Sequence, residues 1–171
     1  LRALPRRASS LWLGTWAPVL MDTLRVILGD QLSLNLATLD NLDPSRDAIL
    51  MMEVMEENTY VGHHKQKIVM VLAAMRHFAK TLRKRGLIVD YINLDDPDNT
   101  GSFTTEIQRA VLRHRPNHIV VAEPSEWRVL EMVKSWEGLT GISIEIRADH
   151  RFFASRERFA AWANSRRSWR M

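Results

Sequence analysis

Short apolar runs alternate with amphipathic stretches from residue 24 onward, and this alternation restricts the fold more than any other feature. The runs have the length of strands and lack helical periodicity. They are LRVIL (24–28), AILMMEVM (48–55), LIVDYINL (87–94), HIVVAE (118–123) and ISIEIR (142–147). Continuous apolar runs are typical of parallel strands that are buried on both faces. We therefore predict an α/β fold with a Rossmann-like, five-stranded parallel sheet and helices on both faces.

The clearest helix is expected over residues 64–85, where apolar side chains recur at i, i+3, i+4 and i+7 along one face. Four cations crowd residues 80–85, next to the negative end of the helix dipole, and Gly86 is a natural stop. These cations could contact phosphates, but a solvated helix end is the preferred interpretation. Shorter helical patterns are expected over residues 34–42, around 107–111, over 125–136 and over 155–166.

The net charge of +4 is concentrated at the two ends of the chain. Residues 1–20 contribute +3 and residues 151–171 contribute +5, which leaves −4 for residues 21–150. The basic composition is therefore a poor argument that the folded body binds nucleic acid. The chain has no cysteine, which excludes a disulfide, a thiolate nucleophile and a cysteine-ligated cluster within it.

The length of 171 residues suits one globular domain. No apolar run approaches the roughly 18 residues that span a bilayer, so we expect no membrane partner and a cytoplasmic location. Residues 1–20 begin with basic and apolar side chains, as a secretory signal does. Gly14, Thr15 and Pro18 interrupt the apolar part, and Met21 stands just before the first predicted strand. Residues 1–20 are therefore expected to be a non-native or disordered extension.

Polar side chains follow the predicted strands, where open parallel sheets bind their ligands. Asp30 and Gln31 come after the first strand and offer a carboxylate and an amide to a polar ligand, although Asp30 could equally cap the following turn. After the second strand, Glu53 and Glu57 could accept hydrogen bonds from a heteroaromatic ring, and Tyr60 could stack on it. Neither G-x-G-x-x-G nor G-x-x-x-x-G-K-[ST] is present, so a dinucleotide or P-loop site is not expected.

Catalytic and metal sites are not expected from these residues. His63 and His64 are adjacent and therefore point in different directions, and there is no H-E-x-x-H motif. They are either solvated residues at a helix start or a loose imitation of a paired-histidine nucleotide site. No serine lies in a G-x-S-x-G motif, which disfavours a triad hydrolase.

Six segments carry a resemblance to a known family. They are RVILGDQL (25–32), EVMEENTYVGHHKQKI (53–68), AMRHFA (74–79), DDPDNTGSFTTEI (95–107), AEPSEWRV (122–129) and DHRFFASRERFAAWA (149–163). In this order they resemble the bacterial photolyase-related family, the branch of iron–sulfur photolyases and cryptochromes that includes prokaryotic (6-4) photolyases. The resemblance runs from about Leu24 to Arg167, and the number and order of the segments make it more specific than any single motif.

The resemblance implies that residues 21–167 form the N-terminal α/β antenna domain of such a protein and that residues 168–171 are a truncated end. The parent reaction is light-driven repair of pyrimidine lesions by a DNA photolyase, which is a lyase. FAD and an iron–sulfur cluster are expected only in a C-terminal flavin domain, the partner of this one. DNA is then a partner only through the full-length protein, and this chain alone is not expected to be an enzyme.

The resemblance also implies a light-harvesting chromophore, 6,7-dimethyl-8-ribityllumazine. Carried over residue by residue, its pocket falls on Asp30, Glu57, Tyr60 and Val71, of which the first three also follow predicted strands. Two alternatives remain open at this point. The chain could be a nucleotide-binding α/β enzyme of adenylyl-transferase type, or an inert structural remnant whose exposed apolar surface promotes self-association.

Overall fold

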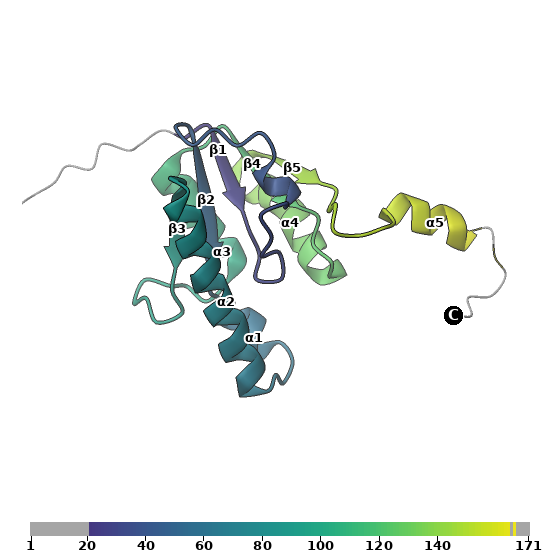
Figure 1. The fold of residues 1–171 in the computed structure, drawn as a ribbon, viewed down its shortest axis with the longest axis horizontal. Coiled ribbons are helices and arrows are strands. Elements are labelled where there is room, and N and C mark those ends of the chain that lie inside the picture. The colour runs from purple at the N-terminus through teal and green to yellow at the C-terminus, as the bar shows by residue number, and fades with distance from the viewer. Residues whose placement is uncertain (1–20, 165, 167–171) are drawn as a thin grey trace, which may run out of the picture.

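Five parallel strands form a single sheet in the order β3-β2-β1-β4-β5 (Figure 1). The computed structural model describes residues 21–164 and 166, so the expected extension over 1–20 and the expected truncated end over 168–171 lie outside the described residues. The strands are β1 (Thr23–Val26), β2 (Asp47–Met52), β3 (Ile88–Ile92), β4 (His118–Ala122) and β5 (Ser143–Arg147). The predicted Rossmann-like parallel sheet is confirmed.

Helices cover both faces of this sheet, as predicted. They are η1 (Ala37–Leu39, a 3-10 helix), α1 (Met55–Thr59), α2 (Lys65–Lys84), α3 (Phe103–His114), α4 (Trp127–Thr140) and α5 (Arg156–Asn164). On one face, α3 and α4 bury Ile107 and Trp136 against the strands. On the other face, α2 and the segment around η1 bury Met75 and Leu36. In Figure 1, α5 stands apart from the sheet.

The predicted helix over 64–85 is present as α2. His64 precedes it in extended conformation, and its Nδ1 accepts a hydrogen bond from the backbone N–H of Gln66, so this histidine caps the helix. Gly86 follows it with φ of +80°, a conformation that glycine adopts at little cost. None of the helices in the described part of the chain is both long and apolar enough to cross a membrane.

Two sequence predictions need correction. The second strand ends at Met52 rather than at residue 55, because Met55 begins the short helix α1. The helix expected within residues 34–42 is reduced to the three residues of η1. Helical periodicity did not distinguish these short elements, since a helix of one turn repeats no face.

Two arginines hold the connection between β1 and β2 on the sheet. Arg25 is only 4% exposed; its Nε lies 2.7 Å from Oδ2 of Asp47, and its Nη1 donates to the carbonyl oxygen of Asp40 at 2.9 Å. Arg147, from β5, donates to the carbonyl oxygens of Ala37 at 3.1 Å and Asp40 at 2.8 Å. Backbone carbonyls that a longer helix would have paired internally are therefore satisfied by side chains.

Candidate functional site

A cavity opens where the sheet changes its winding direction. The chain runs from β1 outward to β2 and β3, and then returns past β1 to β4 and β5. Ligands of open α/β sheets bind outside the carboxyl ends of the strands at such a point. A cavity of about 280 Å³ lies here, and its walls include Gly29, Asp30, Glu57, Phe103, Ser125 and Glu126. A second cavity, of about 130 Å³, shares Glu57 with the first and is also lined by Tyr60 and Val71.

Asp30 connects the end of β1 to the ends of β4 and β5. Its Oδ2 accepts a hydrogen bond from the Ser125 hydroxyl at 2.8 Å, and its carbonyl oxygen accepts one from Arg151 at 2.7 Å. No backbone N–H among the described residues donates to its carboxylate, so the alternative that Asp30 caps the following turn is not observed. The exposed carboxylate remains able to accept further hydrogen bonds at the cavity wall.

Gln31 is placed in the interior and not at the cavity. Its side chain is fully buried. The amide nitrogen donates to the carbonyl oxygen of Ala122 at 3.0 Å, and the amide oxygen accepts from the backbone N–H of Leu28 at 3.4 Å. Gln31 therefore ties the loop after β1 to the end of β4 and presents no surface to a ligand.

Glu53 is likewise structural. Its carboxylate accepts hydrogen bonds from Nε and Nη2 of Arg76 at 2.6 and 2.7 Å, from the Tyr91 hydroxyl at 2.5 Å and from the backbone N–H of Leu94 at 2.8 Å. Burial works to raise the pKa of Glu53, but the bonds from Arg76, Tyr91 and Leu94 outweigh it and hold the pKa below its ordinary value. Burial and the bond to Glu53 raise the pKa of Tyr91. All four acceptor directions of the carboxylate are used within the protein.

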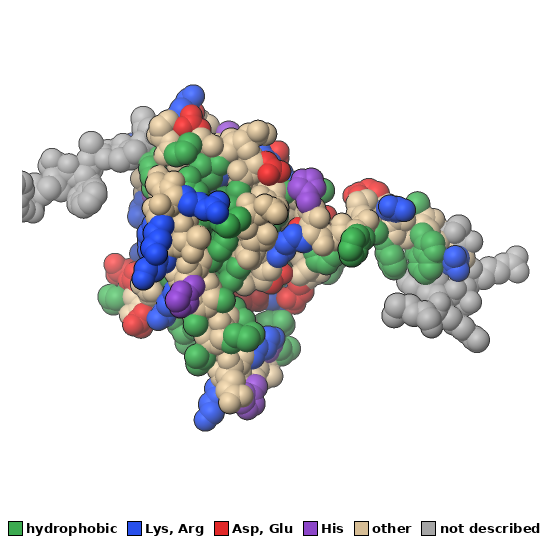
Figure 2. Space-filling view, viewed as in Figure 1, with side chains coloured by type: hydrophobic (Ala, Val, Ile, Leu, Met, Phe, Trp, Pro, Cys, Tyr) green, Lys and Arg blue, Asp and Glu red, His purple; other side chains and the backbone are tan. Residues whose placement is uncertain are grey.

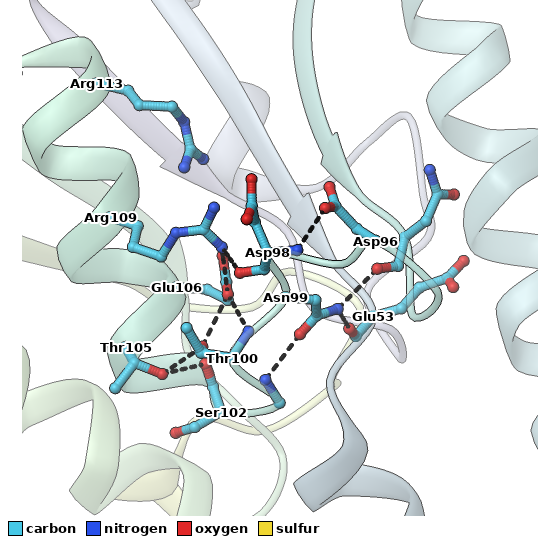
Figure 3. A network of polar contacts seen from close by, with 12 residues as sticks. Glu53, Asp96, Asp98, Asn99, Thr100, Ser102, Thr105, Glu106, Arg109 and Arg113 are labelled. Atoms are coloured by element: carbon cyan, nitrogen blue, oxygen red, sulfur yellow. Dashed lines mark hydrogen bonds and ion pairs between the residues drawn. The ribbon is translucent and has the colours of Figure 1, made fainter.

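The loop between β3 and α3 continues this network (Figure 3). The amide of Asn99 donates to the carbonyl oxygen of Glu53 at 2.7 Å and accepts from the backbone N–H of Gly101 at 2.8 Å. The fully buried carboxylate of Glu106 accepts from the backbone N–H and the hydroxyl of Thr100, at 2.7 and 2.8 Å. The second half of the loop is thereby fixed to the connection between β2 and α1 and to α3.

Helix α1 is attached to this loop through Glu56. The backbone N–H of Glu56 donates to the carbonyl oxygen of Gly101 at 3.0 Å, and its carboxylate accepts from the backbone N–H of Phe103 at 2.7 Å. Glu56 thus caps α3, whose own preceding residue, Ser102, makes no side-chain cap. The position of α1, and with it the position of Glu57, depends on the loop between β3 and α3.

Arg128 joins Glu57 to Tyr60. Its guanidinium forms an ion pair with Glu57 and another with Glu126, the latter at 3.1 Å, and lies 4.1 Å from the centre of the Tyr60 ring. Burial works to lower the pKa of Arg128, but the hydrogen bonds to the two carboxylates raise it above its ordinary value. Sequence reasoning did not select Arg128, although it stands six residues after the end of β4 within AEPSEWRV.

Val71 approaches the same place from α2. A Cβ atom added at Gly29 would lie 3.4 Å from Cγ1 of Val71 and 3.1 Å from the sulfur of Met75, so α2 packs closely on the loop after β1. Val71 lines the smaller cavity with Glu57 and Tyr60. The structure therefore brings Asp30, Glu57, Tyr60 and Val71 to two cavities with a common wall, and keeps Gln31 and Glu53 out of them.

Comparison with known proteins agrees with the resemblance noted in the sequence. The model of a family described as "Deoxyribodipyrimidine photo-lyase-related protein" matches residues 25–171. The chain belongs to this family. A protein named "(6-4) photolyase" from Agrobacterium fabrum (strain C58 / ATCC 33970) is 48% identical to this photolyase-related chain over 151 residues, which are 88% of the chain and 30% of that relative. The chain thus spans less than a third of the length of the relative.

The two adjacent histidines of the photolyase-related chain do not form a joint site. His64 caps α2, and Nδ1 of His63 lies 3.2 Å from Nζ of Lys67. The His63 ring also meets the Tyr60 ring edge-on, with 5.6 Å between centroids. Within residues 21–164, no group of three or more histidines and carboxylates is arranged to hold a metal ion. The arrangement favours the interpretation of these histidines as solvated residues at a helix start.

Proposed function

We propose that this chain is the light-harvesting domain of a photolyase-related protein and that it binds 6,7-dimethyl-8-ribityllumazine. The observation that carries the proposal is the convergence of Asp30, Glu57, Tyr60 and Val71, from three distant segments, on two cavities with a common wall. The larger cavity is close to the lower end of the roughly 300–1,000 Å³ found for small-molecule sites. When bound, the chromophore would absorb near-ultraviolet or violet light and pass the excitation to a flavin.

The residues present fit the chemistry of such a ligand. The Glu57 carboxylate can accept a hydrogen bond from a ring N–H, and Asp30 with Ser125 can bond the hydroxyls of the ribityl chain. Tyr60, which is 45% exposed, offers a ring face for stacking, and Val71 an apolar wall. Arg128 now covers that ring face and pairs with Glu57, so a ligand has to share these contacts with it or displace it.

The proposal is tested by adding the lumazine to the purified chain and recording its absorbance after removal of free ligand. Val71→Phe should fill the smaller cavity and weaken binding at least tenfold. Val69→Phe is the matched control, because Val69 is on the same helix but 66% exposed and lines neither cavity. A chain that is folded by circular dichroism but retains no pigment would refute the proposal and support an inert remnant.

In a longer protein, we propose that the excitation passes to FAD in a C-terminal flavin domain, which also holds an iron–sulfur cluster and repairs DNA lesions in light. This rests on the family and on the name of the Agrobacterium relative. Phe153, just before α5, and Phe159, on α5, have exposed aromatic side chains that would suit contact with that domain. A chimera with residues 21–164 in place of the matching part of the relative should repair a (6-4) lesion under violet light, and dark-level repair would contradict the proposal.

A further inference from the structure

Cations are distributed very unevenly over the folded body. Residues 65–85, which are α2 and its C-terminal cap, carry seven lysines and arginines and no acidic residue. The rest of residues 21–150 carries eight lysines and arginines and nineteen acidic residues. The small net charge of residues 21–150 is therefore the sum of one strongly basic helix, α2, and an acidic rest of the body.

The ion pairs also differ between residues 65–85 and the rest of the body. Among the described residues of 21–150, seven of the eight cations outside α2 and its cap pair with a carboxylate, and Arg115 is the exception. Within residues 65–85 only Arg76 does so, with Glu53. Among the described residues, the acidic side chains of the body thus pair mainly with cations elsewhere and leave the cations of α2 and its cap, apart from Arg76, without carboxylate partners.

Four of the six cations of this segment without a carboxylate partner lie in the C-terminal half of α2 and its cap, and they are Lys80, Arg83, Lys84 and Arg85. Met75, Ala79 and Leu82 are buried against the sheet, so Lys80 and Lys84 point away from it. These two lysines are four residues apart, which places them on one side of the helix with a separation of about 6 Å along its axis. Figure 2 shows lysine and arginine side chains clustered over this part of the molecule.

Helix stability does not account for this arrangement. Cations favour the last turn of a helix through its dipole, but the effect falls off within that turn, and Lys80 precedes the end of α2 by four residues. Two lysines at i and i+4 also repel each other and destabilise the helix slightly. The repulsion is relieved when an anion lies against both.

We propose that the face formed by Lys80 and Lys84 binds the phosphate backbone of duplex DNA. A nucleic-acid backbone offers closely spaced negative charges that match a row of cations without base recognition. A membrane surface fits less well, because interfacial helices combine cations with an exposed apolar face. The exposed apolar residues of α2, Val69 and Met70, lie about 15 Å along the helix from Lys80. This chain would then contact DNA itself, independently of any chromophore.

The test measures the binding of the full chain to a fluorescently labelled duplex by anisotropy, in the dark, without chromophore and at several salt concentrations. Lys80→Ala/Lys84→Ala is compared with Arg115→Ala/Arg158→Ala, which removes the same charge from two exposed cations elsewhere. Loss of two phosphate contacts should lower the slope of log K against log salt by about 1.8. Affinity at low salt should fall at least tenfold below that of the control.

The outcomes separate the alternatives. Retained binding in Lys80→Arg/Lys84→Arg, with loss in the alanine pair only, supports the proposal. Equal loss in the alanine pair and in the control pair overturns it, because net charge alone would explain such a result; unchanged binding overturns it too. If the alanine pair instead loses binding to vesicles of anionic phospholipid while DNA binding stays the same, the face is a membrane contact. Circular dichroism checks that each variant is folded, and the lumazine assay is unaffected by any of these results.

Discussion

Replacing Glu53 by glutamine should lower the free energy of unfolding by about 3 kcal/mol at pH 7. The wild-type carboxylate is 1% exposed and accepts four hydrogen bonds, two of them from Arg76. Glutamine keeps one acceptor oxygen, but its NH₂ group would face N–H or O–H donors, so about two bonds are lost at about 1.5–3 kcal/mol each for bonds to a charged group. Arg76 is half-exposed and can be hydrated, which places the expected loss near the lower end of that range.

The assay is urea unfolding followed by circular dichroism at pH 7 and at pH 3. Because the folded-state pKa of Glu53 lies below its ordinary value, its contribution is present above about pH 4.5 and is lost as the pH falls through the folded-state pKa. The difference between wild type and Glu53→Gln should therefore shrink at pH 3. Glu131→Gln is the control, since Glu131 pairs with Lys134 at the surface and should cost less than about 1 kcal/mol. A difference below about 1 kcal/mol for Glu53→Gln, or one that does not change with pH, would refute the reasoning.

Three further predictions concern other contacts. Arg128→Gln removes the ion-pair partner of Glu57 and should speed amide hydrogen exchange in α1, measured by mass spectrometry. The free energy of unfolding should change by less than about 1 kcal/mol, because the pair is partly exposed. Unchanged exchange would show that the pair does not hold α1 in place. Arg25→Met leaves Asp47 buried without its ion-pair partner and should cost about 3–5 kcal/mol in urea unfolding, and a loss near zero would contradict that cost. Gly101→Ala should cost about 1–2 kcal/mol in thermal unfolding because φ there is +78°, and an unchanged melting temperature would contradict that strain.

The sheet and its main helices could be predicted because burial produces a recognisable pattern of apolar residues along the sequence. A strand covered on both faces needs apolar side chains at every position, and β2 and β4 are buried almost throughout. A long helix packed on a sheet repeats its apolar face, as α2 does through Met75, Ala79 and Leu82. Helix α1, with five residues, shows no such pattern, and the run that precedes it therefore looked longer than the strand is.

The candidate site could be predicted only in part. Asp30 and Gln31 are neighbours after the same strand, yet one lies at a cavity and the other bonds to a carbonyl oxygen 91 residues away. Glu53 has the same kind of position, but its partners include Tyr91, 38 residues along the chain. Which polar side chain satisfies the backbone and which stays available to a ligand depends on these distant partners. Arg128 was missed for the same reason, because its carboxylate and aromatic neighbours meet only in the folded chain.

The hydrogen bonds from Arg147 to the carbonyl oxygens of Ala37 and Asp40 affect the order in which the protein folds during synthesis. The two bonds join residues 110 and 107 positions apart, so the connection between β1 and β2 leaves the ribosome long before the side chain that fastens it. Long-range contacts of this kind form late, because the intervening chain must first be ordered. One side of β4 likewise stays open to other chains until β5, the strand that carries Arg147, has been made, and slow translation of that last strand would prolong the exposure.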